Sequence, residues 1–302
     1  MTKDYEKCYN SFKDNLKNHI QTNKNELYHY TSSSGLKNIL NSKKIWFSNV
    51  EYLNDEEEIY YTYKLAIDVA NDLKATLNKN FYSDTISILE KYLKQKESQE
   101  QPRDYYVASF SEEKDSLSLW NYYTKSPNSV GYNICFTIKD IINSQIENLK
   151  STFDTSKIFL GKIIYDPEQQ KNIIKETMIA FNNLYIKEKD YKNCIMINMH
   201  YWFSIRDCSL FFKHPAFEQE KEFRVILPIS NCVKDNSSIK IRESGLFFIP
   251  YIEIGFESQN VISVTCSPTA KNQLIQAGVK KMLSAYKYNS IPVEISNIPL
   301  RY

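Results

Sequence analysis

Hydrophobic and polar residues alternate in many short segments of the chain, and this alternation predicts β-strands. One of these segments is the aromatic run Tyr28-His29-Tyr30-Thr31. Because successive side chains of a strand point to opposite faces, we expect His29 to lie on the face opposite Tyr28 and Tyr30. The predicted strands cover residues 26–31, 45–48, 106–110, 131–136, 158–165, 223–227, 238–241, 247–254, 261–266 and 293–295.

Other segments repeat their apolar residues at the spacing of an amphipathic helix. The predicted helices cover about residues 3–22, 35–40, 56–77, 80–98, 117–123 and 270–286, with two more within 168–213. These helices and strands predict an α+β fold, and we expect a mixed or antiparallel β core. We expect one domain over residues 1–302, with an N-terminal helix in 1–25 and a large helical insertion over 56–100.

Length, composition and charge exclude some classes of protein for this chain. With 302 residues and 42% hydrophobic content, the chain can bury a sizeable core. Its 38 basic and 36 acidic residues give a net charge of +2, which excludes an extended electrostatic footprint on nucleic acid but not a local contact. The sequence shows no membrane-spanning run and no apolar leader, so we expect a soluble, cytoplasmic protein that does not contact membranes.

Six cysteines are scattered along the chain without CxxC pairs. This pattern argues against a zinc ribbon and against a disulfide framework, and favours free thiols. No G-x-S-x-G segment is present, so a serine-hydrolase elbow is not predicted either.

Hydroxyl and aromatic side chains meet at the predicted strand 106–110 and the helix after it. Ser109 and Ser111 lie at the strand end, and Trp120 and Tyr123 lie in the helix. Hydroxyls can orient a sugar, and aromatic faces can stack on a planar ring. The alternative is that Trp120 and Tyr123, three residues apart, form an apolar helical face that packs into the core.

Two acidic segments are further candidates. In the segment 49–58, the carboxylates of Asp55, Glu56 and Glu58 either bind a divalent cation or interact favourably with a helix N-terminus. In the segment 218–227, alternation places Glu220, Glu222 and Arg224 on one face of a strand. Neighbouring carboxylates repel each other unless a cation compensates them, and Arg224 is such a cation. The alternative there is a ladder of surface ion pairs.

The order of these motifs resembles the DUF2971 family over about residues 27–268. The matching segments are HYTS, then SN and LND-x-x-E, then SFS, LW-x-x-Y and G-x-x-x-x-F, then KHP-x-F-x-x-E-x-E-x-R, and finally Ser267-Pro268.

More remotely, a histidine in H-Y-[ST], a serine-bearing strand and an E-x-E segment that enters a late strand resemble the ordered motifs of the ADP-ribosyltransferase superfamily. That resemblance implies a split sheet with NAD, the substrate, held in a cleft between two small sheets. It implies that His29 hydrogen-bonds the adenosine ribose and that Ser109 and Ser111 brace the cleft strand. Glu222 would bind the nicotinamide ribose, and Glu220 would orient the acceptor nucleophile.

The same resemblance assigns stacking on nicotinamide to Tyr30, Trp120 or Tyr123. Thr31 and Arg224 complete the cofactor-binding candidates, and no metal ligand is assigned. No arginine lies near His29 in the sequence, so a pyrophosphate contact would come from Lys37, Lys43 or Lys44, from a helix N-terminus or from a distant residue.

The leading hypothesis is therefore a transferase that consumes NAD and modifies a nucleic acid or protein, as a toxin or phage-defence effector. Two alternatives remain open: a non-catalytic domain that senses a ligand or partner, and a metal-dependent phosphodiesterase built from the two acidic segments.

Overall fold

The structure, a computed structural model, describes residues 3–52, 58–94, 105–123, 130–149, 158–228, 238–288 and 290–299. Its internal contacts group the chain into two compact units. The helical unit comprises Met1–Gln21, Leu53–Arg103 and Gly161–Glu218. The sheet unit comprises Thr22–Tyr52, Asp104–Leu160 and Gln219–Tyr302.

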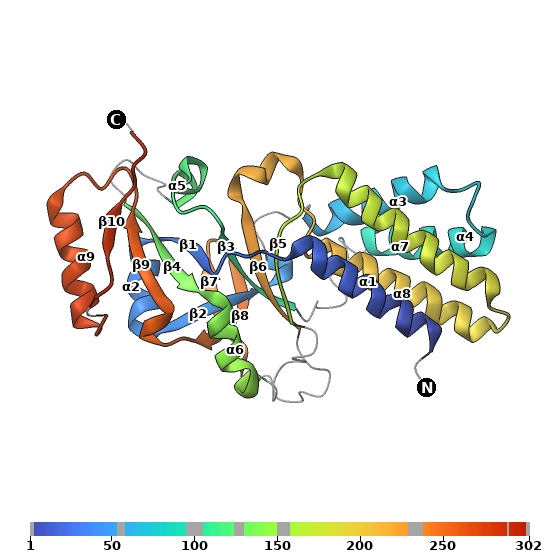
Figure 1. The fold of residues 1–302 in the computed structure, drawn as a ribbon, viewed down its shortest axis with the longest axis horizontal. Helices are drawn as coiled ribbons and strands as arrows, with labels where there is room; N and C mark the ends of the chain where they lie inside the picture. The colour runs from blue at the N-terminus through green and yellow to red at the C-terminus, as the bar shows by residue number, and fades with distance from the viewer. Residues whose placement is uncertain are drawn as a thin grey trace. The chain divides into compact units, whose positions relative to one another are not determined.

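The helical unit is organised around helix α8. Its helices are α1 (Asp4–Ile20), α3 (Glu58–Asp72), α4 (Lys79–Lys94), α7 (Pro167–Lys187) and α8 (Tyr191–Ser209). α8 contacts each of the four other helices (Figure 1). Its Tyr201 is buried, with the rings of Phe81 and Phe181 packed edge-on at centroid distances of 5.7 and 5.9 Å. Such aromatic pairs add to the free energy gained from burial.

The described strands form one ten-stranded sheet (Figure 1). They are β1 (Glu26–Ser32), β2 (Lys44–Asn49), β3 (Tyr105–Ser111), β4 (Gly131–Thr137), β5 (Phe159–Lys162), β6 (Glu222–Pro228), β7 (Lys240–Ser244), β8 (Phe247–Gly255), β9 (Val261–Cys266) and β10 (Val293–Ile295). The main order is β10-β9-β4-β1-β3-β2-β8-β7, while β6 pairs with β3 and β5. β10 runs parallel to β9, whereas β1, β2 and β6 run antiparallel to β3, so the sheet is mixed.

Strand β3 is the point at which the sheet divides. One edge of β3 pairs with β6 from Tyr105 to Ser111. The other edge meets β1 at the register pair Tyr28–Ser111, and it meets β2 at Ser48–Val107 and Asn49–Tyr106. The strands β10-β9-β4-β1 and the strands β2-β8-β7 therefore form two groups that share β3.

The two faces of the sheet differ in chemistry because apolar and polar residues alternate along each strand. One face carries Leu27, Ile134, Phe110 and Phe223 and forms the main core of the unit. Residues of α2 (Ser33–Ser42), α6 (Ile138–Leu149) and α9 (Gln273–Ala285) belong to the same apolar cluster. The opposite face carries polar residues such as Asn133, and α5 (Leu117–Tyr123) contributes Leu119 and Trp120 to a small cluster with Tyr30 there.

Most predicted elements are confirmed, as is the mixed α and β composition. The helix α6 was not predicted, and the helix predicted over 270–286 begins only at Gln273. The single-domain organisation stays a prediction; α3 and α4, the helices of the predicted insertion, group with α1, α7 and α8. The described cysteines Cys8, Cys135, Cys194, Cys208 and Cys266 are free as expected, and Cys232 lies outside the described residues.

Candidate functional site

Three of the predicted motifs lie on neighbouring strands of the sheet unit, in the order β1, β3, β6. Register places Tyr28 opposite Ser111, and Ser111 opposite Glu222. The next row on the same face places Ser109 opposite Arg224. The side chains of Ser109, Ser111, Glu222 and Arg224, together with Tyr30 of β1, therefore share one face, and we call them the β1–β3–β6 region.

Glu222 and Arg224 form a buried ion pair at the centre of this region. The Arg224 guanidinium donates from Nε to Glu222 Oε1 at 2.7 Å and from Nη2 to Oε2 at 3.0 Å. Glu222 is 6% exposed and Arg224 is 2% exposed. A bidentate pair of this kind fixes the orientation of both groups. The prediction that Arg224 compensates the carboxylate is confirmed, and the surface ion-pair ladder does not describe this pair.

Glu220 does not continue the strand face, so the prediction that it shares a face with Glu222 and Arg224 is wrong. It ends the 3-10 turn Pro215–Glu220, before β6 begins. Lys221 then adopts a left-handed conformation with φ of 42°, which interrupts the alternation of an extended chain. This bend presents two carbonyls to β3: Ser111 Oγ donates to Glu220 O at 2.7 Å, and Glu112 N donates to Lys221 O at 2.9 Å.

His29 lies on the opposite, apolar face, as alternation predicted. Its ring is 5.6 Å from the ring of Phe110, and its Nδ1–H donates to the carbonyl oxygen of Ser109 at 3.2 Å. Burial lowers the pKa of His29, and the hydrogen bond to Ser109 opposes that shift only in part. The neutral imidazole therefore ties β1 to β3 where the two strands separate. The sheet does not bring the His29 side chain together with Glu222.

The aromatic candidates are enclosed by their neighbours. Tyr30 Oη donates to Glu113 O at 2.9 Å and accepts from Ser116 N at 3.1 Å. Trp120 is 0% exposed and meets the Tyr30 ring edge-on at 4.7 Å. Burial raises the pKa of Tyr30, so its phenol stays protonated. For Trp120 the structure matches the core-packing alternative, and the Tyr123 side chain lies outside the described residues.

Thr31 is held on the apolar face at the junction of β1 and α2. It is 7% exposed, and a Cβ atom added to Gly35 would lie 1.9 Å from its Oγ1. Ser32 caps α2 by accepting from Gly35 N at 3.2 Å. The glycine thus lets the helix begin directly against Thr31.

Two residues that sequence reasoning missed support this region. Asp115 accepts hydrogen bonds from Trp120 Nε1 at 2.7 Å, Ser296 Oγ at 2.6 Å and Asn297 N at 2.8 Å. Asn133 is 0% exposed and donates from Nδ2 to Lys114 O at 2.6 Å. The polar residues just before the helix Leu117–Tyr123 could have indicated a role for Asp115 from the sequence. Asn133 gave no signal, because its burial depends on how β4 pairs in the sheet.

The metal interpretation stays untested at its main residues. Asp55 and Glu56 lie outside the described residues, as does the Glu58 side chain. Asn49, which begins this segment, is buried, and its Oδ1 accepts from Glu51 N at 2.9 Å. Among the described residues, no group of three or more His, Cys, Asp or Glu side chains could hold a metal ion.

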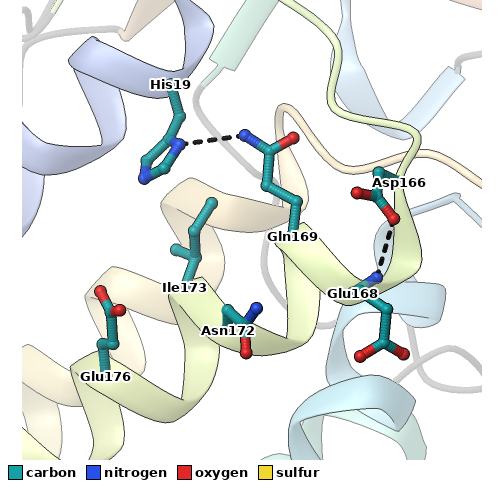
Figure 2. Close-up of a pocket in the computed structure, with 7 residues that line it drawn as sticks. All are labelled: His19, Asp166, Glu168, Gln169, Asn172, Ile173 and Glu176. Atoms are coloured by element: carbon teal, nitrogen blue, oxygen red, sulfur yellow. Dashed lines mark hydrogen bonds between the residues drawn. The ribbon is translucent and has the colours of Figure 1, made fainter.

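A surface hollow of about 390 Å³ lies in the helical unit, between α1 and α7 (Figure 2). Gln169 and His19 are hydrogen-bonded across it at 3.0 Å, and Asp166 Oδ1 accepts from Glu168 N at 3.0 Å. The second bond caps α7, which accounts for Asp166 structurally. None of the residues predicted from the sequence lines this hollow, so we do not assign the site there.

One family model, described as Protein of unknown function (DUF2971), matches residues 119–225. The match includes Trp120, Glu220, Glu222 and Arg224, and it supports the family resemblance over this segment. No curated protein and no solved structure matches the chain. None of the helices that the structure describes is long and apolar enough to cross a membrane.

Proposed function

We propose that the sheet unit is an ADP-ribosyltransferase-like module that binds NAD and transfers its ADP-ribosyl group to a macromolecular acceptor. One observation carries the proposal: the histidine-bearing strand β1, the serine-bearing strand β3 and the strand β6, which begins at Glu222 of the E-x-E segment, lie side by side although they are far apart in the sequence. The division of the sheet at β3 is consistent with the split sheet that the resemblance implies. A toxin or phage-defence role for such a module is an expectation from resemblance.

The chemistry assigns the central role to Glu222. When the bond between nicotinamide and ribose breaks, positive charge develops on the sugar ring, and a nearby carboxylate stabilises that charge. Arg224 keeps this carboxylate oriented through two hydrogen bonds. Because each carboxylate oxygen can accept more than one hydrogen bond, a ribose hydroxyl that donates to Glu222 either adds to these bonds or replaces one of them. Ser109, half-buried on the same face beside Arg224, is the nearest predicted hydroxyl for the sugar.

The test is NAD turnover, measured as nicotinamide release in the presence of cell lysate as acceptor source. Glu222→Gln keeps the shape of the side chain and removes its charge, so we expect turnover to fall about a hundred- to thousandfold. Glu294→Gln is the matched control, because Glu294 of β10 is also a carboxylate of this sheet that pairs with a cation, Lys114. The control should keep most of the activity.

Two measurements separate loss of chemistry from loss of folding. Circular dichroism reports whether Glu222→Gln is folded, and the shift of the melting temperature with added NAD reports binding. A wild-type protein that neither releases nicotinamide nor gains stability from NAD would overturn the proposal. A folded Glu222→Gln variant with wild-type turnover would overturn the role of Glu222.

The second candidate is a non-catalytic domain that senses a ligand or partner. The buried Glu222–Arg224 pair favours this candidate. Arg224 already donates to both carboxylate oxygens of Glu222, from Nε and from Nη2. A pair of this kind can act as a structural element alone. Absence of both NAD binding and turnover, with normal folding, is the outcome expected for this candidate.

A further inference from the structure

The same face of the sheet continues across β2, β8 and β7, where several of its side chains are exposed, among them Trp46 and Phe247. Register places Ser48, Tyr251 and Lys240 in one row, and Trp46 opposite Glu253 in the next. Arg242 and Phe247 follow in the rows toward the end of the β7–β8 hairpin. We call these residues, together with Lys44, the β2–β8–β7 face.

Arg242 is a cation without a carboxylate partner. Its Nη2 donates to Ser48 Oγ at 3.2 Å, and its guanidinium lies 6.0 Å from the centre of the Trp46 ring. No carboxylate of the described residues pairs with it, and its buried Nε has no hydrogen-bond acceptor. Burial lowers the pKa of Arg242, although the side chain stays charged at neutral pH. Such a donor can still bond to a water molecule or to an anionic group of a ligand.

Two aromatic rings on this face are open to solvent. Trp46 is 41% exposed and rests against the ring of Tyr251 at 4.5 Å, so its position is fixed. Phe247 is 59% exposed near the end of the hairpin. Glu253, the partner of Trp46, lies six positions after Phe247 along β8. At the usual rise of a strand, this separation is about 20 Å, which is the length of several nucleotides rather than of one.

Among the described residues of this face, cations outnumber carboxylates. Lys44 Nζ and Lys240 Nζ both donate to Glu253 Oε2, at 2.6 and 2.8 Å. Burial alone would raise the pKa of Glu253, but these hydrogen bonds outweigh it and lower that pKa. One carboxylate thus serves two lysines, and Arg242 adds a third positive charge. The face is locally basic although the whole chain is nearly neutral.

We propose that the β2–β8–β7 face binds a single-stranded nucleic acid, with bases stacked on Trp46 and Phe247 and a phosphate on Arg242. Exposed rings interleaved with cations are the usual components of such sites, because every base offers a π-face and every linkage an anion. Rings as exposed as these do not line an enclosed cavity of the kind that holds a small ligand. The net positive charge of the face complements a phosphate backbone better than an apolar partner protein.

Binding is tested by fluorescence anisotropy with dye-labelled single-stranded DNA and RNA of about 12 nucleotides, a length typical of such sites. NAD is left out, so the result does not depend on the proposed transferase activity. Trp46→Ala should weaken binding about five- to hundredfold, the range found for loss of one stacked base. Arg242→Ala should weaken binding of all sequences and reduce the slope of log K against log salt by about one.

Adjacent residues of β8 give a matched control. Phe247 lies on the β2–β8–β7 face, whereas Phe248, 66% exposed, lies on the opposite face. Phe247→Ala should weaken binding, and Phe248→Ala should not. Equal effects of the two substitutions would overturn the assignment to this face, and absence of oligonucleotide binding by the wild type would overturn the proposal. Free AMP and NAD are added as competitors. If either displaces the oligonucleotide at a concentration no higher than the dissociation constant of the oligonucleotide, the site is one for a free nucleotide and the proposal is wrong.

Discussion

The β1–β3–β6 region and the β2–β8–β7 face lie on the same side of one sheet, and each contains an arginine. Arg224 is buried and delivers two hydrogen bonds to Glu222. Arg242 is partly exposed and has one neutral acceptor, Ser48. A charge that the fold itself neutralises contributes to holding the fold together, whereas a charge left without a counterion remains available to a partner. The difference therefore separates an internally satisfied region from a face suited to binding.

The largest effect on stability is expected from substitution of Arg224. Replacing it with alanine leaves the Glu222 carboxylate buried without its cation, which typically costs about 3–5 kcal/mol of unfolding free energy. We expect Arg224→Ala to show a loss of this size in urea denaturation monitored by circular dichroism. Since this is a large part of the stability of a typical protein, some of the variant is expected to be unfolded without denaturant.

A double substitution distinguishes the missing charge from the missing side chain. Glu222→Leu combined with Arg224→Met removes both charges and keeps apolar volume, and such replacements of buried pairs are often neutral or stabilising. The double variant should therefore be more stable than Arg224→Ala alone. A loss below about 1 kcal/mol for Arg224→Ala would show that the pair is not a buried, mutually dependent unit.

Local patterns were sufficient to predict most of the sheet and the placement of His29. Runs such as Leu27 to Tyr30 form a strand, in which successive side chains point to opposite faces of the sheet. The same rule failed at Glu220 because Lys221 has a positive φ, which a lysine adopts rarely and the sequence does not signal. The helix α6 was missed because it follows β4 directly at Ile138, without a turn signal between them.

The β2–β8–β7 face was not predicted, since it depends on pairing between distant segments. Trp46 and Arg242 are almost two hundred residues apart, and only the register of β2 with β8 and of β8 with β7 brings them onto one face. The enclosure of Trp120 likewise depends on Tyr30 and Asp115, which no local pattern connects to it. Side-chain environments of this kind are set by tertiary pairing, which periodicity does not report.

A smaller effect is expected at His29, which lies on the face of the sheet opposite the Glu222–Arg224 pair. Burial lowers the pKa of His29 in the folded protein, while the unfolded chain titrates near pH 6.5. Below that pH the unfolded state binds the proton more readily, so stability is lost as the pH falls. The contribution of one such histidine is at most about 1.4 kcal/mol per pH unit. His29→Gln should flatten the pH dependence of the unfolding free energy between pH 7 and 5, measured by urea denaturation. An unchanged pH dependence would contradict the buried, neutral state.

Arg242→Ala is expected to change the unfolding free energy least of these variants. A small change would show that Arg242 contributes little to the stability of the fold. The substitution removes one hydrogen bond to Ser48 and a long cation–π contact to Trp46, each a minor contribution at a partly exposed site. It also removes a buried Nε without an acceptor, which offsets part of that loss. We expect the unfolding free energy to change by no more than about 0.5 kcal/mol under the conditions used for Arg224→Ala. A loss above about 2 kcal/mol would show that Arg242 supports the fold itself, and the contrast between the two arginines would then give no reason to expect a partner.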